Sequence, residues 1–315
     1  MHKLTLVVAA VAACLFTAAA TSAAPASVYS VGNSLTWDAQ PESVAATAAN
    51  AGHTLTTGFH IRGNGSLPFI LNNPTDISFT SSHGNWSDAL DGHDWDAVTL
   101  QTFYGGTLAS DVTAARTVMA EARKRPGNAD TVYYLYNAYP GTPAAGRTYA
   151  DGWLAPSENA DGQATTLSRA YFSDLYARVA AAEPNAVVHT IPVGEVLYEL
   201  EAAILRGELA GLSSASDLYR DGVHLNNVGR FAAAMTWYAT LYGANPTGLP
   251  VIEQYWRASN NDWPTDETIT PDLRDAIQGI AWDVVQADAT TGVPEPASLS
   301  MLVVAGGLLL RRRHR

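Results

Sequence analysis

The alternation of short apolar runs with longer helical patterns constrains the fold of this chain more than any other feature. Strand-like runs are predicted at residues 26–31, 55–61, 95–101, 131–136 and 186–193. Helices are predicted between or after them, at residues 41–50, 111–125, 164–182, 194–207, 227–242 and 271–286. A repeated strand–helix–strand order favours a parallel sheet with helices on both of its faces. The sequence therefore predicts an α/β fold.

Two stretches interrupt this alternation. Residues 63–94 are polar and rich in Asn, Ser and Gly, so we expect a long loop there. Long loops in compact domains are usually functional or disordered. Residues 247–292 hold Trp256, Trp263 and the last predicted helix, and we interpret them as a helical extension and linker that covers the main domain. A separate C-terminal domain is the alternative. In the helix at 111–125, Asp111 is the expected N-cap.

The N-terminal segment differs from the body of the chain. Lys3 precedes an apolar run from Leu4 to Ala20, and small residues follow at 22–24. This order predicts a secretory signal peptide over residues 1–24. A lipoprotein signal is an alternative because Val11–Cys14 fits a lipobox, but the residues after Cys14 stay apolar. A structural helix or a membrane anchor is the remaining alternative.

The C-terminal segment, residues 293–315, has its own pattern. Pro294-Glu295-Pro296 is followed by an apolar run at 299–310 and by an arginine cluster at 311–315. A membrane-spanning helix needs roughly 20 apolar residues, so a permanent anchor is not expected. The order of these features resembles the PEP-CTERM sorting signal of bacterial exported proteins. The resemblance implies export and a partner, a membrane-bound sorting protease that removes the tail; an uncleaved weak anchor is the alternative.

The charge of the remaining body excludes some partners. The whole chain has 18 Lys and Arg against 30 Asp and Glu, a net charge of −12. The ends hold five of the basic residues and one of the acidic residues. Residues 25–292 therefore keep 13 basic and 29 acidic residues, a net charge of −16. Because phosphates attract Lys and Arg, no nucleic acid partner is expected.

Cysteine use narrows the chemistry further. The only cysteine, Cys14, lies in the predicted signal peptide. We therefore expect an exported body without disulfides, thiolate metal sites or a cysteine nucleophile. The His and Asp residues between 83 and 96 fit no metal-ligand spacing, and no metal is expected.

Two short segments carry residues suited to nucleophilic catalysis. Ser34 follows the first predicted strand, and Asp221 and His224 are three residues apart in one turn. Sites in open parallel sheets form at the carboxyl ends of strands. A serine nucleophile needs a base, and the base needs a group that orients it. Alternatively, Ser34 only caps a helix, Asp221 starts an ordinary turn and His224 is a surface histidine.

Together, and in this order, the two segments resemble the SGNH (GDSL-type) hydrolase superfamily. The resemblance extends over roughly residues 27–243, which we place in a domain at 25–246. It implies a three-layer α/β/α flavodoxin-like fold and ester hydrolysis through an acyl-enzyme, with no cofactor. It also implies that Ser34 is the nucleophile, His224 the general base and Asp221 the acid that orients it.

The family also has an oxyanion hole, built from the N–H of the serine, a glycine N–H and an asparagine side chain. The resemblance implies Ser34 and Gly65 for the first two positions, with Gly63 as an alternative to Gly65. The family's Gly-x-Asn-Asp block is absent after the run at 95–101. Gln101 offers the same amide donor on a longer arm and is the expected replacement. The alternatives are that Gln101 bonds to backbone at a strand end and that residues 63–67 are only a loop.

Tyr104 and Arg220 are the predicted substrate contacts. An aromatic ring suits a sugar and a guanidinium suits an anion, but both residue types also pack in cores or form surface ion pairs. The resemblance thus implies an exported serine esterase that hydrolyses an acyl ester, with acetyl as the expected acyl group, on a carbohydrate or another small molecule. The rival is a non-catalytic exported surface or matrix protein with the same fold. A nucleotide-binding protein is disfavoured because no Gly-x-Gly-x-x-Gly fingerprint is present.

Overall fold

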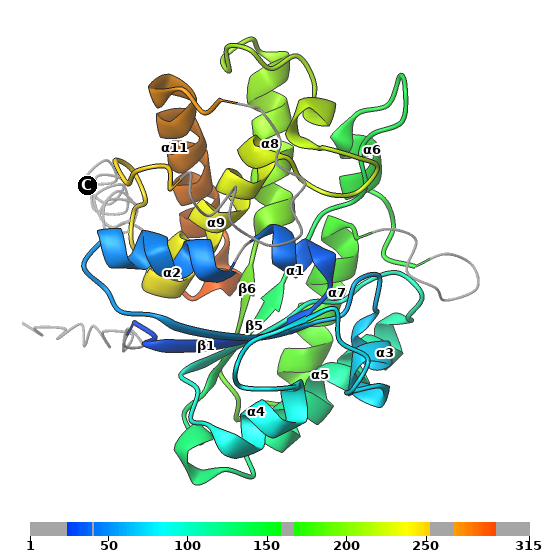
Figure 1. Ribbon diagram of the computed structural model, residues 1–315. Helices are drawn as coiled ribbons and strands as arrows, with labels where there is room; N and C mark the ends of the chain where they lie inside the picture. Colours follow the sequence, from blue (N-terminus) through cyan, green and yellow to red (C-terminus); the bar gives the residue numbers. More distant parts are fainter. Residues whose placement is uncertain (1–23, 40, 159–166, 253–267, 294–315) are drawn as a thin grey trace, which may run out of the picture.

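The computed structural model describes residues 24–39, 41–158, 167–252 and 268–293, which surround one six-stranded sheet (Figure 1). Nearly all residues of the predicted signal peptide and of the predicted C-terminal sorting signal lie outside the described residues. Cys14, Trp256 and Trp263 lie outside them as well. In the part of the chain that is described, no helix is both long and apolar enough to cross a membrane.

The sheet has the strand order β3-β2-β1-β4-β5-β6. Its strands are β1 (Ser27–Gly32), β2 (Thr56–Ile61), β3 (Phe79–Thr80), β4 (Ala97–Leu100), β5 (Val132–Tyr136) and β6 (Val188–Ile191). Every neighbouring pair is parallel except β2 and β3, which are antiparallel with Ile61 opposite Phe79. The mostly parallel sheet confirms the prediction of an α/β fold.

Burial explains why the central strands are almost entirely apolar. All residues of β4 and β5 are buried, as are five of the six residues of β1. Helices cover both faces of a parallel sheet, so its strands have no solvent-exposed side and no polar alternation.

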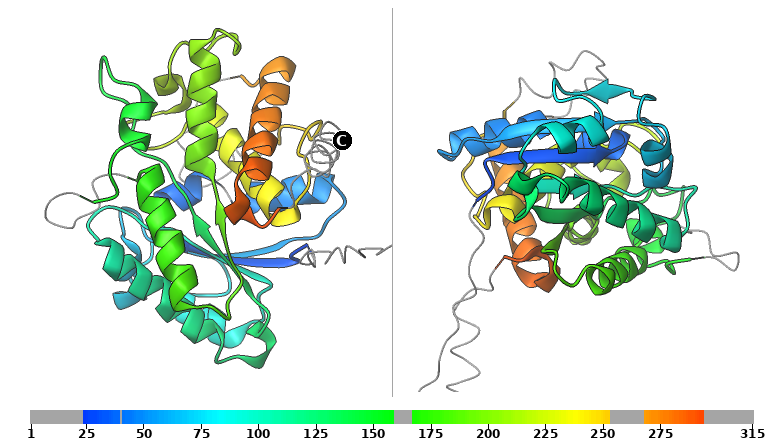
Figure 2. Two further views of the ribbon diagram at one scale, coloured as in Figure 1. Left: turned by 180° about the vertical axis from the view of Figure 1, so that it is seen from behind. Right: turned by 90° about the horizontal axis from the view of Figure 1, so that it is seen from below.

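Helices form a layer on each face of the sheet, as the views in Figures 1 and 2 show. The helices are α1 (Ser34–Asp38), α2 (Pro41–Asn50), α3 (Leu67–Asn72), α4 (Trp86–Gly92), α5 (Leu108–Ala122), α6 (Tyr149–Trp153), α7 (Arg169–Ala182), α8 (Val193–Leu205), α9 (Asn227–Tyr242) and α11 (Pro271–Ala287). Helix α9 packs against α2, α8 and α11 on one face, and α5 packs against α3, α4 and α7 on the other. The three-layer α/β/α arrangement is as predicted.

Helix α9 is buried on all sides. Every residue from Val228 to Leu241 is buried, because α2, α8 and α11 surround this helix. The apolar face of α11, which includes Leu273, Ile277 and Ala281, supplies one of these contacts. The last predicted helix therefore packs on α8 and α9, in the helical layer on one face of the sheet.

Two local predictions were wrong. Residues 63–94 are not one long loop, because α3, β3 and α4 form within them. Helix α5 begins three residues before Asp111, and Thr107 is its N-cap, with its side chain accepting from the N–H of Ser110 at 3.1 Å. Asp111 lies inside the helix, fully buried, where it accepts a hydrogen bond from the Tyr171 hydroxyl at 2.6 Å.

Candidate active site

The strand order places the candidate serine at a topological switch point. The chain passes from β1 to β2 on one side of β1 and later returns to β4 on the other side. Ligands of open α/β sheets bind where the strand order reverses, at the carboxyl ends of the strands. Ser34 lies two residues after the end of β1, and Gln101 directly follows the adjacent β4.

The turn between β1 and α1 is closely packed. A Cβ atom at Gly32 would lie 2.2 Å from Thr36 Oγ1 and 2.8 Å from Gln101 Oε1, so only glycine fits there. Asn33 is fully buried and caps α1, with its Oδ1 accepting from the N–H of Leu35 at 2.9 Å. Ser34 is half-buried at the first position of the helix. The turn therefore presents this serine at the end of a buried strand.

The first-turn N–H groups of α1 have different environments. The N–H of Leu35 donates to Asn33 Oδ1, that of Thr36 to Gln101 Oε1 at 3.2 Å, and that of Trp37 to the Asn33 carbonyl at 3.1 Å. Within the described part of the chain, the Ser34 N–H has no such acceptor. It is therefore a candidate donor to a substrate oxygen.

Gln101 supports the serine turn from the neighbouring strand. Its side chain is 1% exposed, and its Oε1 accepts from the Asn33 N–H at 2.9 Å and from both the N–H and the hydroxyl of Thr36. Its Nε2 donates to the Thr102 carbonyl at 2.9 Å. The contacts of Gln101 are thus those of a buried strand end, and its role as an oxyanion donor stays a prediction.

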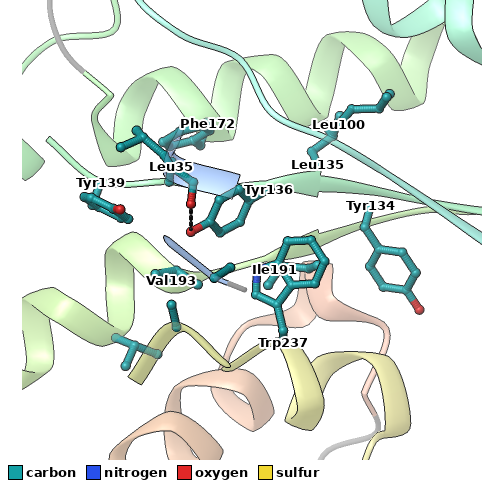
Figure 3. Close-up of a cluster of buried hydrophobic side chains, with 14 of the residues drawn as sticks. Leu35, Leu100, Tyr134, Leu135, Tyr136, Tyr139, Phe172, Ile191, Val193 and Trp237 are labelled. Atoms are coloured by element: carbon teal, nitrogen blue, oxygen red, sulfur yellow. Dashed lines mark hydrogen bonds between the residues drawn. The ribbon is translucent and has the colours of Figure 1, made fainter. Parts of the chain in front are cut away.

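A buried aromatic pair, Tyr136 and Trp237, supports α1 from the core. The Tyr136 hydroxyl at the end of β5 donates to the Leu35 carbonyl at 3.4 Å, as Figure 3 shows. Tyr136 in turn packs edge-on against Trp237 of α9, with ring centroids 5.3 Å apart. The helix that begins at Ser34 thus rests on the central core.

Asp221 and His224 are paired in the loop before α9. The Asp221 Oδ2 lies 2.8 Å from His224 Nδ1, and Oδ1 accepts from the backbone N–H groups of Val223 and His224 at 2.9 and 2.8 Å. The loop is closed by a bond from the Arg220 N–H to the His224 carbonyl at 2.9 Å. Because Nδ1 faces the carboxylate, a nucleophile would meet the imidazole at Nε2.

The Asp221 carboxyl is held in its ionised form. Partial burial acts to raise its pKa, but hydrogen bonds from the N–H groups of Val223 and His224 and from the His224 ring outweigh burial, and the pKa is lowered. A carboxylate at this position can fix the tautomer of the imidazole and stabilise its cation.

The serine helix and the Asp221–His224 loop are in direct contact through Asp38. Asp38 ends α1, and its Oδ2 accepts from the Leu225 N–H at 2.9 Å. Among the described residues, no hydrogen bond joins Ser34 Oγ to the His224 ring. The structure thus brings together the segments that carry the predicted triad, and the proton transfer between Ser34 and His224 stays a prediction.

The predicted glycine block lies beside the serine turn. The Gly65 carbonyl accepts from Asn33 Nδ2 at 3.0 Å. The Gly65 N–H donates to the Arg62 carbonyl at 3.0 Å, closing a turn in which Asn64 has a φ of 57°. The Gly63 N–H donates to Ser78 Oγ at 3.0 Å. Both glycine N–H groups are engaged within the protein, and the oxyanion role of Gly65 stays a prediction.

The two predicted substrate contacts have different surroundings. Tyr104 is half-buried and packs edge-on against Phe103, with ring centroids 4.8 Å apart. Burial raises the pKa of Tyr104, and hydrogen bonds that its hydroxyl oxygen accepts from the backbone of Leu167 and Gly141 partly offset this effect. The Arg220 side chain is only 6% exposed and donates to Asp38 Oδ1 at 2.8 Å. Its guanidinium is thus bonded within the protein, and its role as a substrate contact stays a prediction.

Sequence reasoning missed Asp38, Asn33 and Arg230 as parts of this site. Asp38 and Arg230 are both buried, and Arg230 Nε lies 3.2 Å from Asp38 Oδ1. A charged residue in an otherwise apolar helix was the available signal, since such residues are almost never fully buried without a partner.

Other features lie apart from this site. A cavity of about 680 Å³ lies between α7, α8 and α11, and Trp153, Phe172 and Ile280 are among its lining residues. None of the residues predicted for catalysis or substrate binding lines it. In the described ranges, no three His, Cys, Asp or Glu side chains gather closely enough to hold a metal ion.

Comparisons with known proteins show the fold. No family model and no curated protein matches the sequence. Among solved structures, a DUF4886 family protein from Bacteroides uniformis has a TM-score of 0.54 at 19% identity, covering 82% of this chain and 94% of that one. A "putative acylhydrolase" from Bacteroides fragilis has a TM-score of 0.36 at 13% identity, covering 67% and 83% of the two chains. The first of these similarities shows that the chain shares the α/β fold of a solved bacterial protein.

Proposed function

We propose that this protein is a serine esterase that hydrolyses an acyl ester, with Ser34, His224 and Asp221 as its catalytic triad. The observation that carries the proposal is the carboxylate–imidazole pair at 2.8 Å, in a loop bonded to the helix that begins at Ser34. A base oriented by a carboxylate beside a serine at a strand end is the arrangement that nucleophilic acyl transfer needs.

The reaction proceeds in two halves. Ser34 Oγ attacks the ester carbonyl while His224 Nε2 takes the hydroxyl proton, and the resulting imidazolium is stabilised by Asp221. The tetrahedral intermediate collapses, the C–O bond of the ester breaks, and the alcohol leaves with the proton from His224. Water then attacks the acyl-enzyme while His224 takes a proton from the water. The bond to Ser34 Oγ breaks, the carboxylic acid leaves, and Ser34 Oγ receives the proton from His224.

The Ser34 N–H is the best-supported donor to the developing oxyanion. It lacks an acceptor in the described part of the chain, whereas the N–H groups of Gly65 and Gly63 donate within the protein. Loss of one such donor costs roughly 3–4 kcal/mol of transition-state stabilisation in a serine hydrolase. A second donor from Gly65 or Gln101 would require these residues to exchange their present partners when substrate binds.

Aromatic side chains near the serine support an acetyl or other small acyl ester on a carbohydrate as the substrate. Trp37 lies three residues after Ser34 on α1, and residues at this spacing share a helix face. Trp37 is half-buried and stacks on Phe79, with ring centroids 4.8 Å apart and planes 10° from parallel. Aromatic faces of this kind suit the apolar side of a sugar ring.

The ends of the chain support export as part of the proposal. The N-terminal pattern directs the protein through the membrane, and a membrane-bound sorting protease recognises the C-terminal pattern. The mature enzyme then acts in the cell envelope or outside the cell. Detection of shortened protein outside the cytoplasm, with both ends identified by mass spectrometry, tests this part.

The triad is tested by replacing the serine hydroxyl. Ser34→Ala should abolish hydrolysis of p-nitrophenyl acetate, because no nucleophile remains, while circular dichroism and the melting temperature stay unchanged. Ser110→Ala, a half-buried serine in the capping box of α5, is the matched control and should keep wild-type turnover. Equal turnover by wild type and Ser34→Ala would reject the triad.

A second candidate is a non-catalytic exported surface protein with the same fold. The engagement of Gln101, Gly65 and Gly63 within the protein favours it. A fluorophosphonate probe separates the two candidates because it reacts only with an activated serine. Labelling that disappears in Ser34→Ala supports the esterase, and folded wild-type protein that stays unlabelled supports the surface protein.

A further inference from the structure

We propose that Asp38 and Arg220 are positioning residues, which hold the Asp221–His224 loop in register with the helix that begins at Ser34. This inference rests on the proposed esterase function and deepens it. Neither residue touches the reacting atoms in this scheme. Both residues act by fixing the position of the His224 imidazole.

Asp38 is the hub of the arrangement. Its side chain is fully buried at the last position of α1, four residues after Ser34. Its carboxylate accepts four hydrogen bonds from three other parts of the chain: Tyr139 Oη at 3.0 Å, Arg220 Nη1 at 2.8 Å, the Leu225 N–H at 2.9 Å and Arg230 Nε at 3.2 Å. The two donors from 220 and 225 enclose the Asp221–His224 pair. One carboxylate therefore fixes both ends of the loop to the serine helix.

Arg220 lies between two carboxylates. Its Nη1 donates to Asp38 and to the Leu225 carbonyl, and its Nε lies 3.9 Å from Asp221 Oδ2. Asp221 is 46% exposed, so the contact with Asp38, which is fully buried, is the stronger of the two. The guanidinium thus links the end of the serine helix to the residue that orients His224.

The charges of this group favour one arrangement over others. Two arginines, both at most 6% exposed, share the one carboxylate of Asp38. Burial lowers the pKa of Arg230, and attraction to Asp38 partly offsets that effect. Removing Asp38 leaves two buried guanidinium groups without their shared carboxylate, which is strongly unfavourable. Removing Arg220 takes away the side chain that bonds both to Asp38 and to the Leu225 carbonyl. The loop is therefore expected to keep its place only while Asp38 and Arg220 are both present.

Small displacements of the imidazole have large effects on rate. A misplacement of about 1 Å, caused by a change away from the reacting atoms, can cost roughly 100-fold. A looser loop changes the distance from His224 Nε2 to Ser34 Oγ, whereas the surfaces that bind the ester stay as they are. The signature of a positioning role is thus a loss of kcat with little change in KM.

The test compares variants of this group by kcat and KM with p-nitrophenyl acetate. Arg220→Gln and Asp38→Asn should each lower kcat by about 10- to 100-fold and leave KM within about 3-fold. Fluorophosphonate labelling of Ser34 should slow by the same factor. Arg220→Lys keeps the positive charge and should restore part of the loss. Folded variants with wild-type kcat would overturn the proposal.

A matched control separates positioning from general loss of stability. Asn128 is fully buried and bonds to the backbone of Leu90, His93 and Trp95, just before β5 and at the opposite end of the sheet from Ser34. Asn128→Ala should lower the melting temperature and leave kcat unchanged at temperatures where the protein is folded. If Asn128→Ala and Arg220→Gln lose the same factor in kcat for the same loss of melting temperature, the role of Arg220 is only structural.

Failure of the esterase function can be told apart from failure of the positioning role. If wild-type protein shows neither hydrolysis nor labelling, the proposed function fails. The position of the loop is then tested by NMR of the His224 imidazole N–H. This signal is assigned by its absence in His224→Gln. Arg220→Gln should shift or broaden this signal, and Asn128→Ala should leave it in place. An unchanged signal in Arg220→Gln would overturn the positioning role by itself.

Discussion

A single amide oxygen, Oε1 of Gln101, accepts three hydrogen bonds from the turn that carries Ser34. The donors are two backbone N–H groups and one hydroxyl, all of them buried. A buried donor that loses its acceptor costs about 1–3 kcal/mol, because water cannot replace the bond. The shape of the serine turn therefore depends on one side chain from the neighbouring strand.

Replacing this side chain by one of similar size and no hydrogen bonds tests that dependence. Gln101→Met should lower the free energy of unfolding by about 2–4 kcal/mol, since three donors lose their acceptor. It should also lower kcat, because the turn that positions Ser34 relaxes. Urea unfolding and p-nitrophenyl acetate kinetics measure the two effects.

Gln278 offers the matched control. It is also fully buried, and it bonds to the Gly248 N–H and the Leu249 carbonyl, far along the chain from the serine turn. Gln278→Met should lose stability but keep kcat. If both variants keep kcat, Gln101 does not position the serine.

At the scale of residues, the sequence reveals chemistry better than it reveals partners. Ser34, Asp221 and His224 could be proposed as a triad because their residue types and chain order are informative. The commitment of Arg220 to Asp38 could not, because the two residues are 182 positions apart and nothing local to either one indicates the pairing. Likewise, the type of Gln101 indicates an amide but does not indicate which way the amide faces.

At the scale of elements, Asp111 shows how the packing of two helices changes the pKa of a carboxyl group. Asp111 lies in α5, where the Tyr171 hydroxyl of α7 donates to it at 2.6 Å. Burial raises its pKa to about 6, and the bond from Tyr171 offsets only part of this effect. The packing of these two helices therefore favours the protonated carboxyl.

The stability of the protein should consequently fall as pH rises through this range. Between pH 3.8 and about 6 the native state holds a proton that the unfolded chain has lost, so the free energy of unfolding decreases with pH. The decrease due to this group is on the order of 2–3 kcal/mol. Asp111→Asn cannot titrate and should lack it. Urea unfolding of both proteins at pH values from 4 to 7 measures the difference, and parallel pH curves would contradict it.

The elements themselves were largely predictable, and the exceptions have physical reasons. The longer strands and helices could be predicted because their buried positions give clear apolar runs or apolar residues at helical spacing in the sequence. The elements within residues 63–94 were missed because β3 has two residues and α3 has six, too few for a period to be visible. The start of α5 was misplaced because Thr107 and Asp111 are both good caps, and only packing against α7 decides between them.

At the scale of the whole molecule, charge limits which esters can approach. The body at residues 25–292 carries a net charge of −16. Arg220 was the expected local exception, but its guanidinium and that of Arg230 are buried against Asp38. Neither of these charges is therefore presented to a substrate, and the long-range field of the body should act on any charged ester.

The dependence of rate on salt measures this field directly. An anionic ester such as 4-acetoxybenzoate should be repelled at low ionic strength, so its kcat/KM should rise several-fold between about 10 mM and 0.5 M salt as the charges are screened. Neutral p-nitrophenyl acetate should change little, and acetylcholine, a cation, should show the opposite trend. Each ester is compared only with itself, so differences in intrinsic reactivity cancel. A kcat/KM for 4-acetoxybenzoate that falls with salt would contradict this prediction and would mean that a positive group faces the substrate.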